Sequence, residues 1–143
     1  MLPLCADQGV GVIPWSPMAR GRLTRNWSET TSRTQNDAFA LKMYQNAESQ
    51  DQKVVEVVAR IAENRQVPRA YVALAWLLSK PGITAPIVGA TKPEHLATAI
   101  TALDFSLTEV EIAALEEPYV PHPVDGIVPP LPEQPPTITP PRG

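Results

Sequence analysis

The sequence predicts an α/β fold, because two short apolar runs that suit buried strands alternate with longer segments of helical periodicity. The runs cover residues 10–15 and 85–88, and neither shows the polar alternation of a strand with one face in water. Each run leads into a turn that contains small residues. The order strand, helices, strand, helices therefore indicates parallel strands that are covered on both faces.

The N-terminal third begins with a helical segment and ends in a long loop. Residues 1–8 are expected to be the last turns of a helix that is closed by Gly9, so that the chain starts inside an element. Residues 24–50 are rich in Thr, Ser, Asn, Gln and charge, which predicts a long loop with one helical turn near residues 39–44. A loop of this length is often functional.

Two helices with different degrees of burial are expected next. Residues 51–64 place apolar side chains on one face and charged side chains on the other, which predicts an outer helix. Pro68 suits the start of the following helix, and residues 70–78 are apolar around most of the circumference, so this helix must be buried. The inward positions of the first helix are Val54, Val55, Val58, Ile61 and Ala62.

Two further helices are expected after the second strand. Pro93 starts a helix whose inward residues are Leu96, Ile100 and Leu103. A short helix then ends near Glu117, and two overlapping capping boxes mark its start. These boxes pair Ser106 with Glu109 and Thr108 with Glu111.

Composition excludes several classes of function. A net charge of −3 gives no overall attraction to nucleic acid or to an anionic membrane, so any phosphate recognition must be local. The chain has no apolar run long enough to span a bilayer and no basic-then-apolar leader. Its single cysteine, Cys5, suits a reducing cytoplasm and is expected to be a small buried apolar side chain. We assign no metal site.

The C-terminal residues differ in composition from the rest. Ten of the 17 prolines fall in residues 118–143, which we expect to form a disordered proline-rich extension, while residues 1–117 form the folded part. The segment Pro129–Pro132 could be a polyproline ligand for an SH3 or WW domain. An extension without a partner is the favoured interpretation, because short PxxP matches arise freely in any proline-rich stretch.

The turn after the second strand has the features of an anion site. Residues 84–95 run from a strand through Gly89-Ala-Thr into a helix, whose first amides and positive dipole end attract phosphate, and Lys92 adds a full charge. A second strand-and-turn segment covers residues 9–21. Two such turns could hold a cofactor that has two separated phosphate groups.

Three motifs, in order, resemble the C-terminal part of an aldo-keto reductase. They are Gly11-Val-Ile-Pro-Trp-Ser-Pro-Met-Ala-Arg-Gly-Arg-Leu-Thr24, Ala73-Leu-Ala-Trp-Leu-Leu78 and Ala85-Pro-Ile-Val-Gly-Ala-Thr-Lys-Pro-Glu-His-Leu96. The resemblance covers about residues 1–125 and implies the C-terminal part of a (β/α)8 TIM barrel, with residues 10–15 as strand seven and residues 85–88 as strand eight. The helix ending near Glu117 would be the extra C-terminal helix. At 143 residues the chain is shorter than the roughly 250 residues of a complete barrel.

The resemblance implies carbonyl reduction by hydride transfer, usually from NADPH, with a small carbonyl substrate in a full-length parent. The family's Asp, Tyr, Lys and His catalytic residues come from earlier strands, which this chain does not contain. Tyr44, Tyr71 and Tyr119 are not at the family's acid positions, and His122 lies at the exit to the tail. We therefore assign no catalytic residue and expect the chain alone to be inactive.

The first turn is similar to the part of the family's site that holds the nicotinamide and the pyrophosphate. Trp15 matches the aromatic position that stacks on the nicotinamide ring. Ser16, Met18 and Gly21 resemble the loop whose hydroxyl and backbone amides hold the pyrophosphate, and Arg20 adds a nearby charge. The alternatives are a barrel-lining tryptophan and an ordinary Ser-Pro turn.

The second turn resembles the site for the adenosine 2′-phosphate. Gly89 permits close backbone approach, and Ala90 and Thr91 match the amide donors. Lys92 supplies the charge, since a lysine facing the positive end of a helix is otherwise slightly unfavourable. His95 lies one helical turn further on, where it would line the same phosphate or the ribose. The alternative for both side chains is a solvated surface position.

One departure from the family weakens the expected contacts with adenine. Thr98 and Ala99 stand where many members carry Glu and Asn against this base. The resulting hypothesis is the NADPH-binding C-terminal portion of an aldo-keto reductase. Two alternatives stay open: a non-catalytic nucleotide-binding remnant, truncated or regulatory, and an adaptor that acts through its proline tail. A barrel fragment would also self-associate through exposed strand edges and the apolar faces of residues 73–78.

Overall fold

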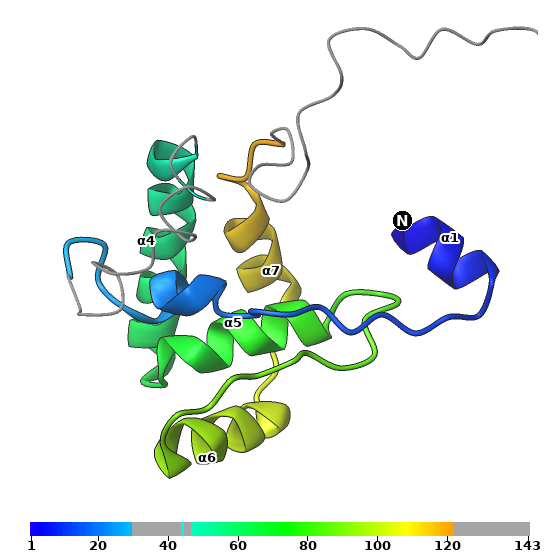
Figure 1. Cartoon of the computed structure of the whole chain (residues 1–143). Coiled ribbons are helices and arrows are strands. Elements are labelled where there is room, and N and C mark those ends of the chain that lie inside the picture. Colours follow the sequence, from blue (N-terminus) through cyan, green and yellow to red (C-terminus); the bar gives the residue numbers. More distant parts are fainter. Residues whose placement is uncertain (30–43, 45–46, 122–143) are drawn as a thin grey trace, which may run out of the picture.

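A computed structural model of the chain describes residues 1–29, residue 44 and residues 47–121 (Figure 1). The expected helical turn at residues 39–44 and most of the long loop lie outside this part, apart from Tyr44 itself. His122 and the proline-rich segment beyond it, including Pro129–Pro132, also lie outside it. Among the described residues, no helix combines the length and apolar character needed to cross a bilayer.

Three helices enclose the core (Figure 1). They are α4 (Glu48–Arg65), α5 (Arg69–Leu78) and α7 (Glu109–Glu116). Helix α5 crosses beneath the other two, and Leu74 and Val72 on α5 are almost completely buried. The central cluster consists of Val58, Ile61, Ala62, Val72 and Leu115.

The two helices predicted from periodicity are confirmed. The inward face of α4 buries Val55, Val58, Ile61 and Ala62, and the helix ends at Gln66 in a left-handed cap with φ 53°. Helix α5 begins after Pro68 and buries most of its first two turns. The expectation that the faces of residues 73–78 are exposed is wrong, because residues 73–75 are buried and residues 76–78 are partly buried.

The two expected strands form only isolated parallel bridges in the described residues, between Val12 and Ile83 and between Trp15 and Ile87. Each bridge has one backbone hydrogen bond, from the Thr84 amide to the Val12 carbonyl at 2.8 Å and from the Ile87 amide to the Pro14 carbonyl at 2.9 Å. Pro14 and Pro86 have no amide hydrogen, so neither can donate to a continuous ladder.

The expected covering of these strands on both faces is also wrong. Val10, Ile13, Trp15 and Ile87 are all at least half exposed. Parallel strands are normally covered because helices and neighbouring strands flank them. In the described residues, the paired segments run along α5 without a further strand on either edge (Figure 1).

Helix α6 (Pro93–Thr101) begins at Pro93 as predicted, but its apolar face is not inward. Leu96 is 53% exposed and Ile100 58%, and Leu103 in the following 3₁₀ turn η2 (Ala102–Asp104) is 65% exposed. The spacing of Leu96, Ile100 and Leu103 therefore predicted the apolar face of this segment correctly. Among the described residues, no side chains cover that face.

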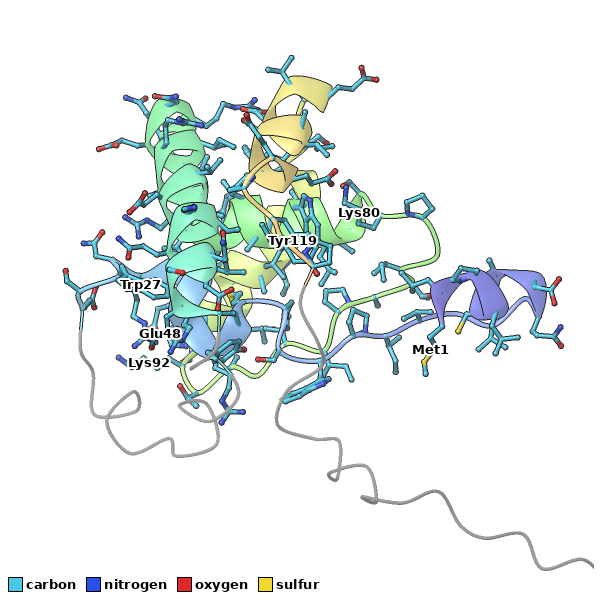
Figure 2. All side chains as sticks on the ribbon, turned by 90° about the horizontal axis from the view of Figure 1, so that it is seen from above. Met1, Trp27, Glu48, Lys80, Lys92 and Tyr119 are labelled. Carbon is cyan, nitrogen blue, oxygen red and sulfur yellow. The ribbon has the colours of Figure 1, made fainter. Side chains whose placement is uncertain are left out.

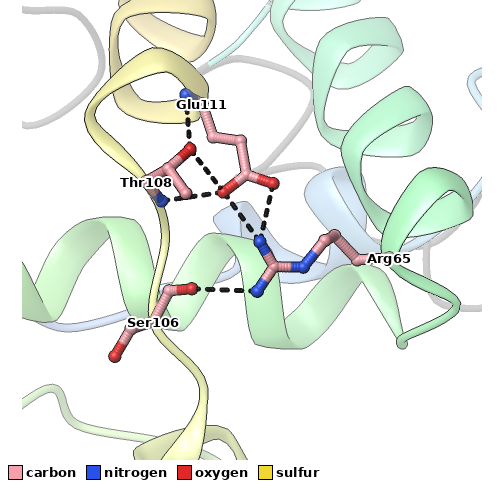
Figure 3. A network of polar contacts seen from close by, with 4 residues as sticks. All are labelled: Arg65, Ser106, Thr108 and Glu111. Atoms are coloured by element: carbon pink, nitrogen blue, oxygen red, sulfur yellow. Dashed lines mark hydrogen bonds and ion pairs between the residues drawn. The ribbon is translucent and has the colours of Figure 1, made fainter.

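Helix α7 uses one of the two possible capping boxes. The Thr108 hydroxyl accepts a bond from the Glu111 amide at 3.2 Å, and the Glu111 carboxylate accepts one from the Thr108 amide at 2.8 Å (Figure 3). The box between Ser106 and Glu109 does not form, since Thr108 is the N-cap of the helix and Ser106 lies two residues before it.

Helix α1 (Leu2–Asp7) confirms the expected N-terminal helix, and Gly9 follows it with φ +65°. The helix stands apart from the core in Figure 1 and buries no residue. Cys5 is consequently only partly buried, which corrects the expectation of a buried side chain.

Candidate functional site

The parallel pairing brings the two expected phosphate turns to the same end of the molecule. Because Trp15 and Ile87 face each other in parallel, the chain leaves both segments in the same direction. Residues 16–21 and 88–92 therefore follow the paired segments on one side. Figures 1 and 2 place the start of α6, marked by Lys92 in Figure 2, and the 3₁₀ helix η1 (Ala19–Thr24) toward the end of the molecule where α5 begins.

The first turn has an unusual backbone. Ser16, Ala19 and Arg20 are non-glycine residues with left-handed φ values of 52°, 47° and 55°, and Gly21 has φ 93°. Such conformations cost energy in residues with a Cβ, and they persist only where the surrounding structure holds them. They cluster at sites that bind ligands, so this turn is a candidate binding loop on conformation alone.

Most amides of this loop are directed at acceptors within it. The Arg20 amide donates to the Ser16 hydroxyl oxygen at 3.1 Å, and the Gly21 amide donates to the Met18 carbonyl at 2.8 Å. The expected role of Gly21 as an amide donor is therefore not available in this arrangement. The Met18 amide has no acceptor among the described residues, and the Ser16 hydroxyl retains its own hydrogen for donation.

Trp15 occupies the last position of the first paired segment. Its side chain is 50% exposed, so it is not a core residue within the described part of the chain. Trp15 lies at the end of the paired segments, and half of its surface is accessible to solvent.

The second turn differs from the first because its amides are open. The amides of residues 89–92 donate to no acceptor among the described residues, and all four residues are exposed. Lys92 is the N-cap of α6 in an extended conformation, with φ −136°, and its side chain does not cap the helix. Open amides, a helix start and an ammonium group together form an environment that favours an anion.

The residues further along α6 are less well placed for a ligand. His95 is exposed, and its amide closes a turn onto the Lys92 carbonyl at 3.1 Å. The Thr98 hydroxyl donates to the Glu94 carbonyl of its own helix at 2.7 Å, and Ala99 offers no polar side chain. The weaker contacts to adenine expected at these two positions remain a prediction.

Sequence reasoning missed two arginines beside the first turn. The Arg25 guanidinium donates to the Gly21 carbonyl at 3.0 Å and to the Arg20 carbonyl at 3.4 Å. Arg69, at the start of α5, donates to the Arg25 carbonyl and to the Asn26 side chain. The only sequence signal for the contact between Arg25 and Gly21 is their separation of four residues. No local pattern indicates the contact made by Arg69, which lies 44 residues from Arg25.

The carboxylates with shifted pKa values lie on α7 and serve the fold. The Thr108 amide, the Thr108 hydroxyl and the Arg65 guanidinium lower the pKa of Glu111, against an opposing effect of burial (Figure 3). Hydrogen bonds from Lys80 and Trp76 lower the pKa of Glu116. In the described part of the chain, no group of three or more His, Cys, Asp or Glu side chains is arranged to hold a metal ion.

Comparison with known proteins identifies the class. The sequence profile described as "Aldo/keto reductase family" matches residues 1–119. The chain therefore belongs to the aldo/keto reductase family. The resemblance stated from the three motifs is confirmed.

Two curated relatives illustrate the extent of the match. The chain is 42% identical over 123 residues to the versiconal hemiacetal acetate reductase of Aspergillus parasiticus, covering 85% of this chain and 36% of that protein. It is 39% identical over 127 residues to an aldo-keto reductase of Fusarium vanettenii, covering 88% of this chain and 34% of that protein. The chain thus spans about a third of the length of these relatives.

A solved structure supports the fold assignment. The crystal structure of a thermostable aldo-keto reductase in complex with the inhibitor epalrestat aligns with a TM-score of 0.53 over 82% of this chain and 33% of that chain. The sequence identity is 24%, so this likeness supports the fold alone. The chain corresponds to part of an aldo-keto reductase fold.

Proposed function

We propose that this chain is the cofactor-binding C-terminal portion of an NADPH-dependent aldo-keto reductase and that it does not itself carry the catalytic residues. One observation carries the proposal. The parallel bridge between Trp15 and Ile87 places a strained small-residue loop and a turn with open amides at the same end of two paired segments. The enzyme names of the two relatives give the proposal its reaction class.

The first turn would hold the nicotinamide half of the cofactor. The half-exposed Trp15 would stack on the nicotinamide ring and fix its orientation. The Ser16 hydroxyl and the Met18 amide are the available donors to the pyrophosphate, and Arg20 would add positive charge. Gly21 would contribute through its left-handed backbone, because its amide is directed at Met18.

The second turn would hold the adenosine 2′-phosphate. The open amides of Ala90 and Thr91 would donate to its oxygens, and Gly89 leaves room for close approach. Lys92 would supply the charge that distinguishes NADPH from NADH. The imidazole of His95, exposed one turn further along α6, would line the phosphate or the ribose.

Bound NADPH would supply the hydride for carbonyl reduction, while this chain would supply binding and orientation. Proton donation to the developing alkoxide requires an acid whose position and pKa suit that step, and we assign no described residue to this role. A small carbonyl substrate is therefore a partner of a longer parent only. We also propose a cytoplasmic location, which the single cysteine supports.

Titration of the 143-residue chain with fragments of the cofactor tests the proposal. NADPH should quench tryptophan fluorescence in a saturable way, and 2′,5′-ADP should compete with it because it carries the 2′-phosphate. 5′-AMP, which lacks that phosphate, is the matched control and should compete poorly. Absence of saturable NADPH binding by the folded chain would contradict the proposed function.

A further inference from the structure

We propose that Arg25 and Arg69 are positioning residues that hold the loop at residues 16–21 in its strained conformation. The inference rests on the cofactor role proposed above for that loop. Neither arginine belongs to the motifs that suggested the site. Both are identified by hydrogen bonds that connect the buried helix α5 to the loop through two successive steps.

The first step joins Arg25 to the backbone of the loop. Its Nε donates to the Gly21 carbonyl at 3.0 Å, and its Nη2 donates to the Arg20 carbonyl at 3.4 Å. The Thr24 hydroxyl donates to the same Gly21 carbonyl at 3.1 Å. Arg20 is a non-glycine residue with positive φ, so the guanidinium bonds one strained residue of the loop and the glycine that follows it.

The close fit of Gly21 supports this assignment. A Cβ at this position would lie 2.9 Å from Nη2 of Arg25, which is closer than real Cβ contacts. The glycine tolerates a φ of 93°, and the guanidinium lies directly beside it. The guanidinium therefore packs on the loop backbone itself.

The second step joins Arg69 to Arg25. From the first residue of α5, Arg69 donates to the Arg25 carbonyl with one Nη atom and to the Asn26 Oδ1 at 2.6 Å with the other. Helix α5 is the most buried of the three core helices, so packing on several sides holds it in place. Arg69 therefore fixes the backbone of Arg25 relative to α5. The side chain of Arg25 in turn fixes the backbone of the loop at residues 20 and 21.

The proposed role predicts a pattern that differs from that of a phosphate ligand. The loop would serve the pyrophosphate, which NADPH and NADH share, so its loss of order should weaken both dinucleotides equally. Arg69 acts on the loop only through Arg25. The loss of dinucleotide affinity in the double variant should therefore be smaller than the product of the two single losses. Loss of the Arg25 contacts should also expose the loop amides without destabilising the core.

The experiment compares Arg25→Ala, Arg25→Lys, Arg69→Ala and the double alanine variant of the 143-residue chain. Arg60→Ala is the matched control, since Arg60 is exposed on α4 and its side chain forms no hydrogen bond or ion pair with a described residue. Titration measures affinity for NADPH and NADH, hydrogen exchange measures protection of amides 19–23, and thermal unfolding measures the stability of the fold.

Arg25→Ala should weaken both dinucleotides by about tenfold, the loss expected for charge-assisted hydrogen bonds. The Gly21 amide should exchange faster by about the same factor, while amides of α4 and α5 keep their protection. Arg25→Lys should give an intermediate result, because a lysine can keep one of the two bonds. The double variant should lose less affinity than the product of the two single losses.

Two results would overturn the inference. Unchanged protection of amides 19–23 in Arg25→Ala would show that the loop does not depend on this side chain. Equal loss of protection throughout α4 and α5 would show a general destabilisation. If the unmodified chain binds neither dinucleotide, the proposed function fails, and a selective loss of protection in the loop would still support the positioning role.

Discussion

Trp15 and Ile87 face each other across a parallel bridge, with the Ile87 amide bonded to the Pro14 carbonyl at 2.9 Å. The pairing depends on close approach at the other end of the segments, where a Cβ on Gly11 would lie 2.5 Å from the Thr84 hydroxyl oxygen. The pairing of Trp15 with Ile87, which are 72 positions apart in the sequence, sets the direction in which the chain enters both phosphate turns. The outer edges of this pair carry backbone groups without a further strand in the described residues.

Self-association is the expected consequence of these edges and of the exposed face of α6. We predict that the purified chain forms oligomers at micromolar concentration, because open strand edges and exposed apolar faces pair readily with other copies. Leu96→Glu together with Ile100→Glu should shift the chain toward the monomer in sedimentation velocity. Both side chains are more than half exposed, so the substitutions should not disturb the core.

The control for this prediction is Val110→Glu. Val110 is 80% exposed on α7, away from α6, and should leave the degree of association unchanged. A monomeric sedimentation profile of the unmodified chain at all concentrations would contradict the prediction.

The helices could be predicted because their signals are local. The apolar positions of α4, the apolar circumference of α5 and the Thr108–Glu111 capping box each depend on residues within a few turns. The burial of the strands and of Leu96 could not be predicted, because burial depends on neighbours and those neighbours are not among the described residues.

In the candidate site, too, the features with a local sequence signal could be predicted, and those that depend on distant residues could not. The turns at residues 16–21 and 89–92 were identified from small residues that follow apolar runs, and the structure places them at one end. The support from Arg69 depends on a tertiary hydrogen bond to the Arg25 carbonyl over 44 residues, whereas the Gly21 amide is directed at the Met18 carbonyl three residues earlier. Such contacts leave no periodic trace in the sequence.

The second prediction concerns the dependence of stability on pH through Glu111. Hydrogen bonds from Thr108 and the Arg65 guanidinium lower the pKa of this carboxyl in the folded chain. A lowered folded pKa gives stability that is fully present above the unfolded value and is lost as pH falls through the folded value. The free energy of unfolding should therefore decrease as pH falls below the ordinary value of 4.5.

Urea unfolding between pH 7 and pH 3 measures this effect. Glu111→Gln should be less stable than the unmodified chain at pH 7, and the difference should shrink toward pH 3. Glu109→Gln is the control, since Glu109 lies in the same turn, is exposed, and makes no ion pair with a described residue. A constant difference between Glu111→Gln and the unmodified chain across this range would contradict the assignment.

The third prediction is that the 143-residue chain has no carbonyl reductase activity. Cofactor binding alone does not provide the positioned proton donor that reduction of a carbonyl requires. NADPH oxidation with a panel of aldehydes and quinones is the measurement. Turnover that survives rigorous purification would contradict the prediction.

The fourth prediction is that Lys92 discriminates between NADPH and NADH through the 2′-phosphate. A charge-assisted contact with phosphate contributes about 1.5–3 kcal/mol, so Lys92→Ala should weaken NADPH by roughly one to two powers of ten. NADH lacks this phosphate and should bind almost unchanged. Lys53→Ala is the control, because Lys53 is an exposed lysine on α4 whose side chain makes no hydrogen bond or ion pair with a described residue.

The expected preference for NADPH depends on local charge. The chain carries a net charge of −3, so little else would attract the extra phosphate, whereas the loop at Ser16 would serve both cofactors alike. Fluorescence titration of both dinucleotides against the unmodified chain and the two variants decides the matter. Equal losses for NADPH and NADH would mean that Lys92 acts through the start of α6. No loss for either would make it a solvated surface lysine.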